Sequence, residues 1–132
     1  MEIKKNVSVC PITASLEVLG GKWKVLVLAR LAEHPLLRFG ELHRLIPKVS
    51  QKMLTQQLRE LEEAGLVARR IYAEVPPRVE YRLTPHGQTL QPVLSALRDW
   101  GDLHRQALGL PARRGKCSPT LKQETGPALT EA

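Results

Sequence analysis

Leucines recur at helical spacing between residues 50 and 65, and this stretch organises the interpretation of the whole chain. Leu54, Leu58 and Leu61 fall at positions i, i+4 and i+7, which places them on one side of a helix. Ser50 stands where an N-cap hydroxyl would accept a hydrogen bond from the first turn. Gly65 stands where a left-handed residue would end the helix. The pattern therefore predicts an amphipathic helix between Ser50 and Gly65.

The polar face of this helix carries side chains that suit DNA recognition. Arginine, lysine, glutamine and threonine hydrogen-bond base edges and phosphates in the major groove. Acidic residues are confined to the last turns, where they would repel phosphates, so we expect the N-terminal end to enter the groove. An ordinary amphipathic surface helix is the alternative that this stretch alone leaves open. The residues expected to contact DNA from this helix are Ser50, Gln51, Lys52, Thr55, Gln56 and Arg59.

The segments before Ser50 complete a helix-turn-helix. Glycines at 20–21 and the His34-Pro35 pair interrupt the helical periods, and residues 47–49 form a tight connection into the Ser50 helix. Two short helices joined by such a turn are typical of a DNA-binding motif whose second helix reads the groove. In chain order the pattern predicts a helix over 11–19, a helix over 22–33 with Trp23, Leu26, Val27 and Leu31 in the core, a short strand over 36–38 and a helix over 39–46.

After Gly65 the hydrophobic period changes from helical to two. Residues 67–72 and 78–83 alternate in this way, with a proline-containing tip at 75–77, which predicts a β-hairpin. A hairpin directly after a helix-turn-helix is the wing of a winged helix. Its arginines, including Arg70 and Arg78, are expected to face phosphates or a narrow minor groove. Solvated arginines on any hairpin are the alternative, and the position beside the reader helix favours DNA.

Apolar positions at both ends of this domain predict a homodimer. Thr84-Pro85 opens a last helix with a wide apolar face, in which Pro92 is expected to produce a kink or to delay regular hydrogen bonding. That helix is longer than a winged-helix core requires, so with the helix over 11–19 it would leave apolar surface exposed on a monomer. A two-fold dimer would bring two reader helices to the half-sites of a palindromic operator. The predicted class is α+β, mainly helical: a winged helix-turn-helix over 11–108 with extra N- and C-terminal dimerisation helices, between a flexible arm (1–10) and a disordered tail (109–132).

Composition narrows the class of partner. The net charge is +7 and aromatic residues make up only 4%, which favours duplex DNA over stacking of single-stranded bases. No signal peptide or long apolar run is evident, and two cysteines do not make a disulfide scaffold, so we expect a cytoplasmic protein without membrane association. The scattered histidines and the lack of a phosphate loop or nucleophile elbow argue against an enzyme, so no catalytic residue, metal or cofactor is expected.

Several short motifs carry a resemblance to a known family. They are Cys10-Pro11, Leu-Gly-Gly-Lys-Trp at 19–23, Arg-Phe-Gly-Glu-Leu at 38–42, the stretch 50–61, Pro-Pro-Arg-Val-Glu-Tyr at 76–81 and Leu83-Thr84. Over roughly residues 8–105 the chain resembles the HxlR-type bacterial transcription regulators, which are winged-helix dimers related to the MarR group. The resemblance implies a dimeric regulator that uses its first and last helices as the interface. Gly40 departs from the pattern, because many relatives carry a polar residue there.

The same resemblance makes Cys10 a candidate redox or electrophile sensor, since some relatives use a cysteine at the matching position. Cys10 precedes a predicted helix, whose N-terminus favours the reactive thiolate. Simple packing of the thiol is the alternative. Two other functions also stay open: a regulator that binds a small effector at the dimer interface, and a winged-helix module that binds protein without specific DNA binding. The protein-binding module would be distinguished by its tolerance of substitutions that neutralise the face formed by Lys52, Gln56 and Arg59.

Overall fold

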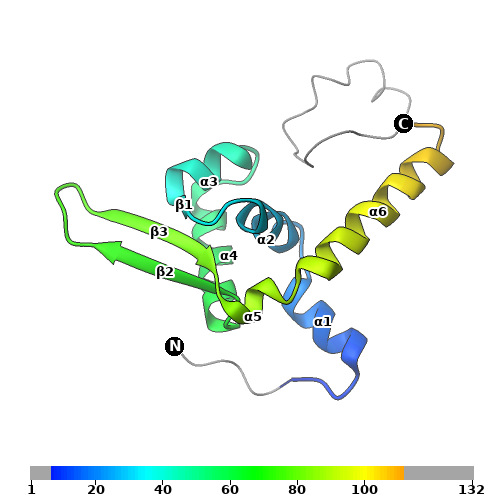
Figure 1. Cartoon of the computed structure of the whole chain (residues 1–132), viewed down its shortest axis with the longest axis horizontal. Helices are drawn as coiled ribbons and strands as arrows, with labels where there is room; N and C mark the ends of the chain where they lie inside the picture. The colour runs from blue at the N-terminus through cyan, green and yellow to red at the C-terminus, as the bar shows by residue number, and fades with distance from the viewer. Residues whose placement is uncertain (1–6, 112–132) are drawn as a thin grey trace.

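Helices and a small antiparallel sheet alternate along residues 7–111, the part of the chain that the computed structural model describes (Figure 1). This arrangement confirms the predicted α+β winged helix-turn-helix class. Residues 1–6 of the predicted arm and 112–132 of the predicted tail, including Cys117, lie outside the described residues. The elements are α1 (Pro11–Leu19), α2 (Lys24–Glu33), β1 (Leu37–Arg38), α3 (Phe39–Leu45), α4 (Gln51–Glu63), β2 (Val67–Tyr72), β3 (Arg78–Leu83), α5 (Pro85–Gln88) and α6 (Gln91–Ala107).

The core lies where α2, α3 and α4 meet the base of the sheet. Leu54, Leu58 and Leu61, the leucines predicted on one side of α4, are each at most 1% exposed. They pack in one cluster with Val27 and Leu31 of α2, which were expected in the core. Trp23 and Leu26 are only partly buried and pack against the edge of this cluster. The helical period therefore identified the buried face, and the extent of burial varies along it.

The sheet has three strands in the order β1-β3-β2, so β3 is central. The hairpin register pairs Val67 with Leu83 at the base and Ile71 with Val79 toward the tip. At the base these side chains are buried, whereas Ile71 is 59% exposed because the wing extends beyond the helices (Figure 1). Glu80 differs from the alternation expected for β3: it is buried at 8% exposure although its neighbours in the pattern are polar. β1 pairs with β3 at this position, with Arg38 opposite Glu80, which removes the carboxylate from an open face.

The last predicted helix is divided in two. Thr84 caps α5 as expected, since its hydroxyl accepts a hydrogen bond from the Gly87 N–H at 2.9 Å. The helix is then interrupted between Gln88 and Gln91, and Pro92 lies in the first turn of α6. A proline is accommodated there because the N–H that it lacks has no partner inside a helix at that position. The expectation of one continuous helix was therefore wrong: regular hydrogen bonding is interrupted just before Pro92, which lies in the first turn of a second helix.

α1 and α6 project from the core on the side away from the wing (Figure 1). No residue of α1 is buried, and Leu94 is the buried residue of α6. The outer side of α6 exposes Leu97, Trp100 and Leu103, with Trp100 and Leu103 each 62% exposed. Such a contiguous apolar surface is unusual on a monomer and is typical of an interaction site. Among residues 7–111 no helix is long and apolar enough to cross a membrane.

Candidate nucleic-acid interface

The turn between α3 and α4 is held by a histidine. His43 Nε2 lies 2.8 Å from the carbonyl oxygen of Val49, and the Val49 N–H donates to the Ile46 carbonyl at 3.3 Å. Val49 is itself buried, so the turn is attached to the core. The His43 side chain is half-buried and bridges the turn. This contact ties α3 to the turn that precedes α4.

α3 begins without a polar side chain at Gly40. Instead, the Glu41 carboxylate accepts a hydrogen bond from the Arg38 backbone N–H at 2.8 Å. This bond satisfies one of the N–H groups near the helix N-terminus that have no partner inside the helix. The departure from the family pattern at Gly40 therefore leaves α3 capped by its neighbour.

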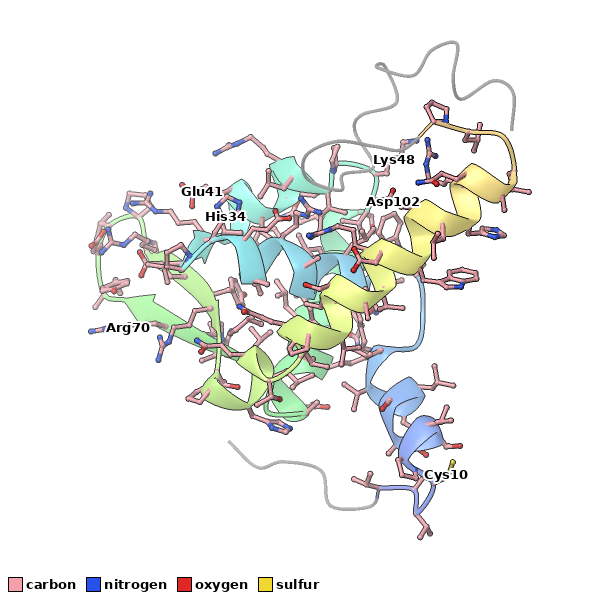
Figure 2. All side chains as sticks on the ribbon, turned by 45° about the vertical axis from the view of Figure 1, so that its right-hand side comes forward. Cys10, His34, Glu41, Lys48, Arg70 and Asp102 are labelled. Carbon is pink, nitrogen blue, oxygen red and sulfur yellow. The ribbon has the colours of Figure 1, made fainter. Side chains whose placement is uncertain are left out.

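The N-terminus of α4 is capped and open to solvent. Ser50 is the N-cap, and its hydroxyl oxygen accepts from the Met53 N–H at 3.0 Å, as its position predicted. The first turn contains no acidic residue. The partial positive charge of a helix N-terminus therefore remains available to an anion at this end. Arg44 and Lys48, exposed around the turn, add two cations that sequence reasoning did not select (Figure 2 labels Lys48).

The side chains expected to contact DNA share one face of α4, and the structure distinguishes among them. Gln51, Lys52, Gln56 and Arg59 are exposed. Thr55 is half-buried, and its hydroxyl donates to the Gln51 carbonyl at 2.9 Å, which leaves only an acceptor and a methyl group for a ligand. Gln56 Nε2 donates to Glu60 Oε2 at 2.8 Å. Glu60 thus lies at the C-terminal edge of the same face.

The wing arginines have different environments. Arg70 is exposed, and its guanidinium lies 4.9 Å from the centre of the Tyr72 ring (Figure 2 labels Arg70). Arg78 covers the same ring at 4.1 Å and pairs with Glu74 at 3.3 Å and Glu80 at 3.6 Å. Two carboxylates therefore offset much of the positive charge of Arg78, whereas Arg70 can meet a phosphate. The hairpin pattern predicts the same role for both arginines, because it does not show where these carboxylates lie.

Cys10 lies at the free end of α1, remote from the wing (Figure 2). Its thiol is exposed and occupies the N-cap position of α1. The thiol makes no capping hydrogen bond, yet the Thr13 side chain, followed by the backbone N–H groups of Thr13 and Ile12, lowers the pKa of Cys10 by favouring the thiolate. This environment fits a reactive cysteine better than a packed one.

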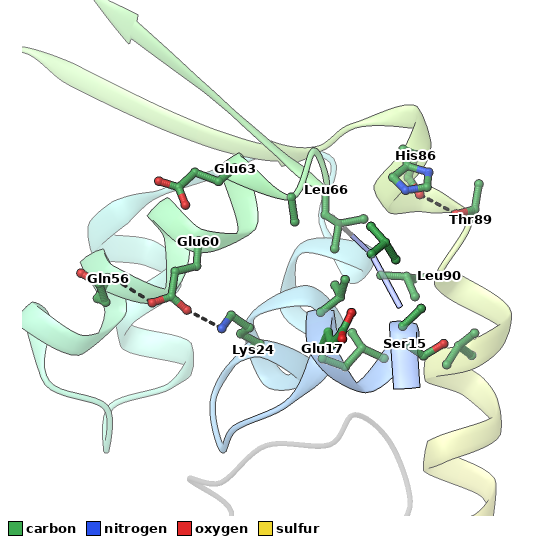
Figure 3. Close-up of a pocket in the computed structure, with 16 residues that line it drawn as sticks. Ser15, Glu17, Lys24, Gln56, Glu60, Glu63, Leu66, His86, Thr89 and Leu90 are labelled. Carbon is green, nitrogen blue, oxygen red and sulfur yellow. Dashed lines mark hydrogen bonds and ion pairs between the residues drawn. The ribbon is translucent and has the colours of Figure 1, made fainter. Parts of the chain in front are cut away.

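A cavity of about 980 Å³ opens between α1, the C-terminal end of α4, α5 and the start of α6 (Figure 3). Its lining mixes apolar side chains such as Val18 and Leu90 with the polar Lys24 and Glu60. Its volume falls within the range of small-molecule sites. The sequence does not predict this cavity, because its walls come from five separate helices, including α2 through Lys24. Within residues 7–111, no His, Cys, Asp and Glu side chains are grouped as metal ligands.

Known proteins resemble both the sequence and this geometry. Residues 18–108 match the family model described as HxlR-like helix-turn-helix. The HTH-type transcriptional regulator YtcD of Bacillus subtilis is 51% identical over 105 residues, which cover 79% of this chain and 80% of YtcD. The solved structure of the redox regulator HypR in its reduced form is 43% identical, with a TM-score of 0.71, and the match covers 76% of this chain and 98% of HypR.

A second similar solved structure is the reduced form of the transcriptional regulator YodB from B. subtilis. It is 36% identical, with a TM-score of 0.62, over 72% of this chain and 93% of YodB. A structure of diamide-treated YodB is similar as well. The family match and the relatives agree with the helix-turn-helix, the wing and the resemblance already evident in the motifs. The chain therefore belongs to the HxlR-like helix-turn-helix family, whose members are DNA-binding transcriptional regulators rather than enzymes.

Proposed function

We propose that this regulator binds a palindromic operator as a homodimer and reads each half-site with α4. The observation that carries the proposal is that α4, capped at its N-terminus, exposes Gln51, Lys52, Gln56 and Arg59 on one polar face. These side chains offer donors and acceptors that match base edges and phosphates. Exposed Arg70 adds a phosphate contact from the wing, and the Ser50 hydroxyl can donate to a phosphate while it accepts from Met53.

The exposed apolar surface of α6 and α1 supports the dimer. Leu97, Trp100 and Leu103 would be removed from water if two copies packed through α6. Ile12 and Leu16 extend the apolar surface onto α1, at 72% and 61% exposure. A two-fold interface of this kind would present two α4 helices on one side of a duplex, for half-sites about one helical turn apart.

DNA binding is tested with duplexes selected by the protein from a random pool, against a scrambled duplex. Fluorescence anisotropy over a salt series should show at least about 10³-fold preference for the selected duplex. Gln56→Ala and Arg59→Ala should reduce that preference, because they lose base contacts. Gln88→Ala, a change of an exposed glutamine on α5, is the control and should leave it unchanged. Equal affinity of all variants for the selected duplex would reject this face, and no binding to any duplex would favour the protein-binding module.

The dimer is tested by sedimentation equilibrium of the parent and of Trp100→Ser. Trp100 is exposed and stacks on His104 at 5.0 Å, so its removal changes the proposed interface without opening the core. We expect the parent to sediment as a dimer and the variant to dissociate at higher protein concentration. A monomeric parent at micromolar concentration would contradict the proposed interface.

Redox control through Cys10 is a second proposed property, favoured by the exposed thiol and its lowered pKa. The similar structures named for redox regulation and diamide treatment support it. Diamide would join two thiolates in a disulfide and be reduced to the hydrazine, either between two Cys10 residues or between Cys10 and a small thiol. Cys10→Ser should then abolish diamide-induced release from DNA, whereas Cys117→Ser should retain it. Release that persists in Cys10→Ser would exclude Cys10 as the sensor.

Control by a small effector is an alternative that the cavity between α1, α4, α5 and α6 favours. The cavity contacts α4, so an occupant could alter the position of the reader helix. An amphiphilic dye with an apolar ring system, such as anilinonaphthalene sulfonate, should bind the dimer and be excluded by Val18→Trp, whose larger side chain fills part of the cavity. Equal dye binding by parent and variant would remove this alternative.

A further inference from the structure

A chain of polar contacts links α2 to the DNA-facing side of α4. Gln56 Nε2 donates to Glu60 Oε2 at 2.8 Å, and the other oxygen of the Glu60 carboxylate accepts from Lys24 Nζ (Figure 3). The Lys24 side chain is only 15% exposed, and that of Glu60 is 37% exposed. The inner end of this chain is therefore held in the protein, while its outer end reaches the face expected to meet bases.

A carboxylate at this position needs an explanation, because it opposes phosphate binding. Lys24 offsets the charge, but an uncharged side chain at position 60 would avoid the repulsion altogether. What a carboxylate adds is directionality: it has only acceptors, so the group beside it must be a donor. The amide nitrogen of Gln56, and not its oxygen, must then face Glu60.

This constraint selects one of the two orientations of the Gln56 amide. A free glutamine amide can rotate by half a turn and exchange its donor and acceptor sides, because its terminal torsion is broadly two-fold. With Nε2 held by Glu60, the amide presents Oε1 as an acceptor together with the one N–H that is left. Adenine offers the complementary pair in the major groove, an N6 amino donor beside the N7 acceptor. Guanine offers two acceptors there, and its O6 would oppose Oε1.

We propose that Glu60 is a positioning residue that sets the base preference of Gln56, favouring adenine over guanine at the contacted position. Lys24 compensates the charge of Glu60 so that this orientation does not prevent phosphate binding. The inference rests on the proposed function, in which the polar face of α4 reads the operator. It assigns to the acidic turn of α4 a part in recognition, where the sequence had suggested only repulsion.

The test uses the full-length protein, four single variants and one double variant, with duplexes selected from a random pool by the parent. Each position of the selected half-site is changed in turn, and dissociation constants are measured by anisotropy. Glu60→Gln should raise affinity for a scrambled duplex, because a negative charge near phosphates is removed. At one position it should also lower the preference for adenine over guanine by about tenfold, within the range that a bidentate base contact supplies. A merely structural role would weaken binding to both duplexes.

Controls separate charge from orientation. Glu63→Gln removes the same charge from an exposed site one turn further along α4. It should raise scrambled-duplex affinity without changing base preference. Lys24→Met should weaken binding to the selected and the scrambled duplex by similar factors. It should retain the preference for adenine, since Glu60 still holds the Gln56 amide. In a Gln56→Ala background, Glu60→Gln should cause no further loss of base preference, because the two changes act on one contact.

Two results would overturn the inference while leaving the proposed function intact. The first is a parent preference for adenine that Gln56→Ala removes and Glu60→Gln retains. The second is equal loss of base preference in Glu60→Gln and Glu63→Gln. A parent that does not prefer the selected duplex over the scrambled one would instead contradict the proposed function itself.

Discussion

The hydroxyl group of Thr84 links the turn after α4 to the start of α5. Thr84 Oγ1 accepts from the Gly87 N–H at 2.9 Å and donates to the Gly65 carbonyl at 2.6 Å. Its backbone N–H also donates to the Leu66 carbonyl at 3.0 Å. Thr84→Val keeps the shape of the side chain and removes both hydroxyl bonds, so it isolates their contribution to stability.

The expected cost follows from what each bond satisfies. Loss of an N-cap costs about 1 kcal/mol. Gly65 is buried, so its carbonyl would lose a partner away from water, which costs about 1–2 kcal/mol more. We therefore expect Thr84→Val to lower the free energy of unfolding by about 2–3 kcal/mol. Thr84→Ser retains the hydroxyl and should lower the free energy of unfolding by less than about 1 kcal/mol.

Guanidinium chloride unfolding of parent, Val and Ser variants would measure these differences, at one fixed protein concentration because a dimer's stability depends on it. A shift in the midpoint without a change in slope would indicate a change in stability alone. The hydroxyl does not stabilise this junction if the free energy of unfolding of Thr84→Val lies within about 0.5 kcal/mol of that of the parent. The same conclusion follows if Thr84→Ser is as unstable as Thr84→Val.

Three further predictions concern single positions. Gly87→Ala should destabilise the protein by about 3 kcal/mol in the same unfolding assay, because a Cβ there would lie 2.2 Å from the Leu66 carbonyl oxygen, a backbone atom that cannot move aside. Gly65→Ala should cost at least about 1 kcal/mol, because φ is +81° and this left-handed conformation is strained for a residue with a Cβ; an unchanged midpoint would contradict this. In a Cys117→Ser background, the pH midpoint of iodoacetamide alkylation at Cys10 should lie below that of a free cysteine peptide, because a lowered pKa extends the thiolate to lower pH; a higher midpoint would contradict the assigned environment.

The ion pairs of individual arginines, in the core and in the candidate site, could not be predicted from the sequence. Arg30 falls in the apolar stripe of α2, yet the pattern did not predict that it would be buried to 2% exposure and paired with Glu33 at 3.0 Å. Periodicity gives the direction of a side chain from the helix axis, but what lies in that direction depends on other elements. The carboxylates that surround Arg78 come from the wing tip and the central strand, so only the register of the hairpin brings them together.

By itself, the sequence determined the order and the limits of most elements, because caps and periods are local. Ser50, Gly65 and Thr84 end or begin helices through their own side chains or backbone, and each does so where the pattern predicted. The tertiary structure alone decided which polar groups meet. The His43 bridge, the carboxylate setting of Arg78 and the contacts from Lys24 through Glu60 to Gln56 join positions whose distance is set by packing. Hydrogen bonds require partners within about 3 Å, and a one-dimensional pattern does not specify distances of that kind between separate elements.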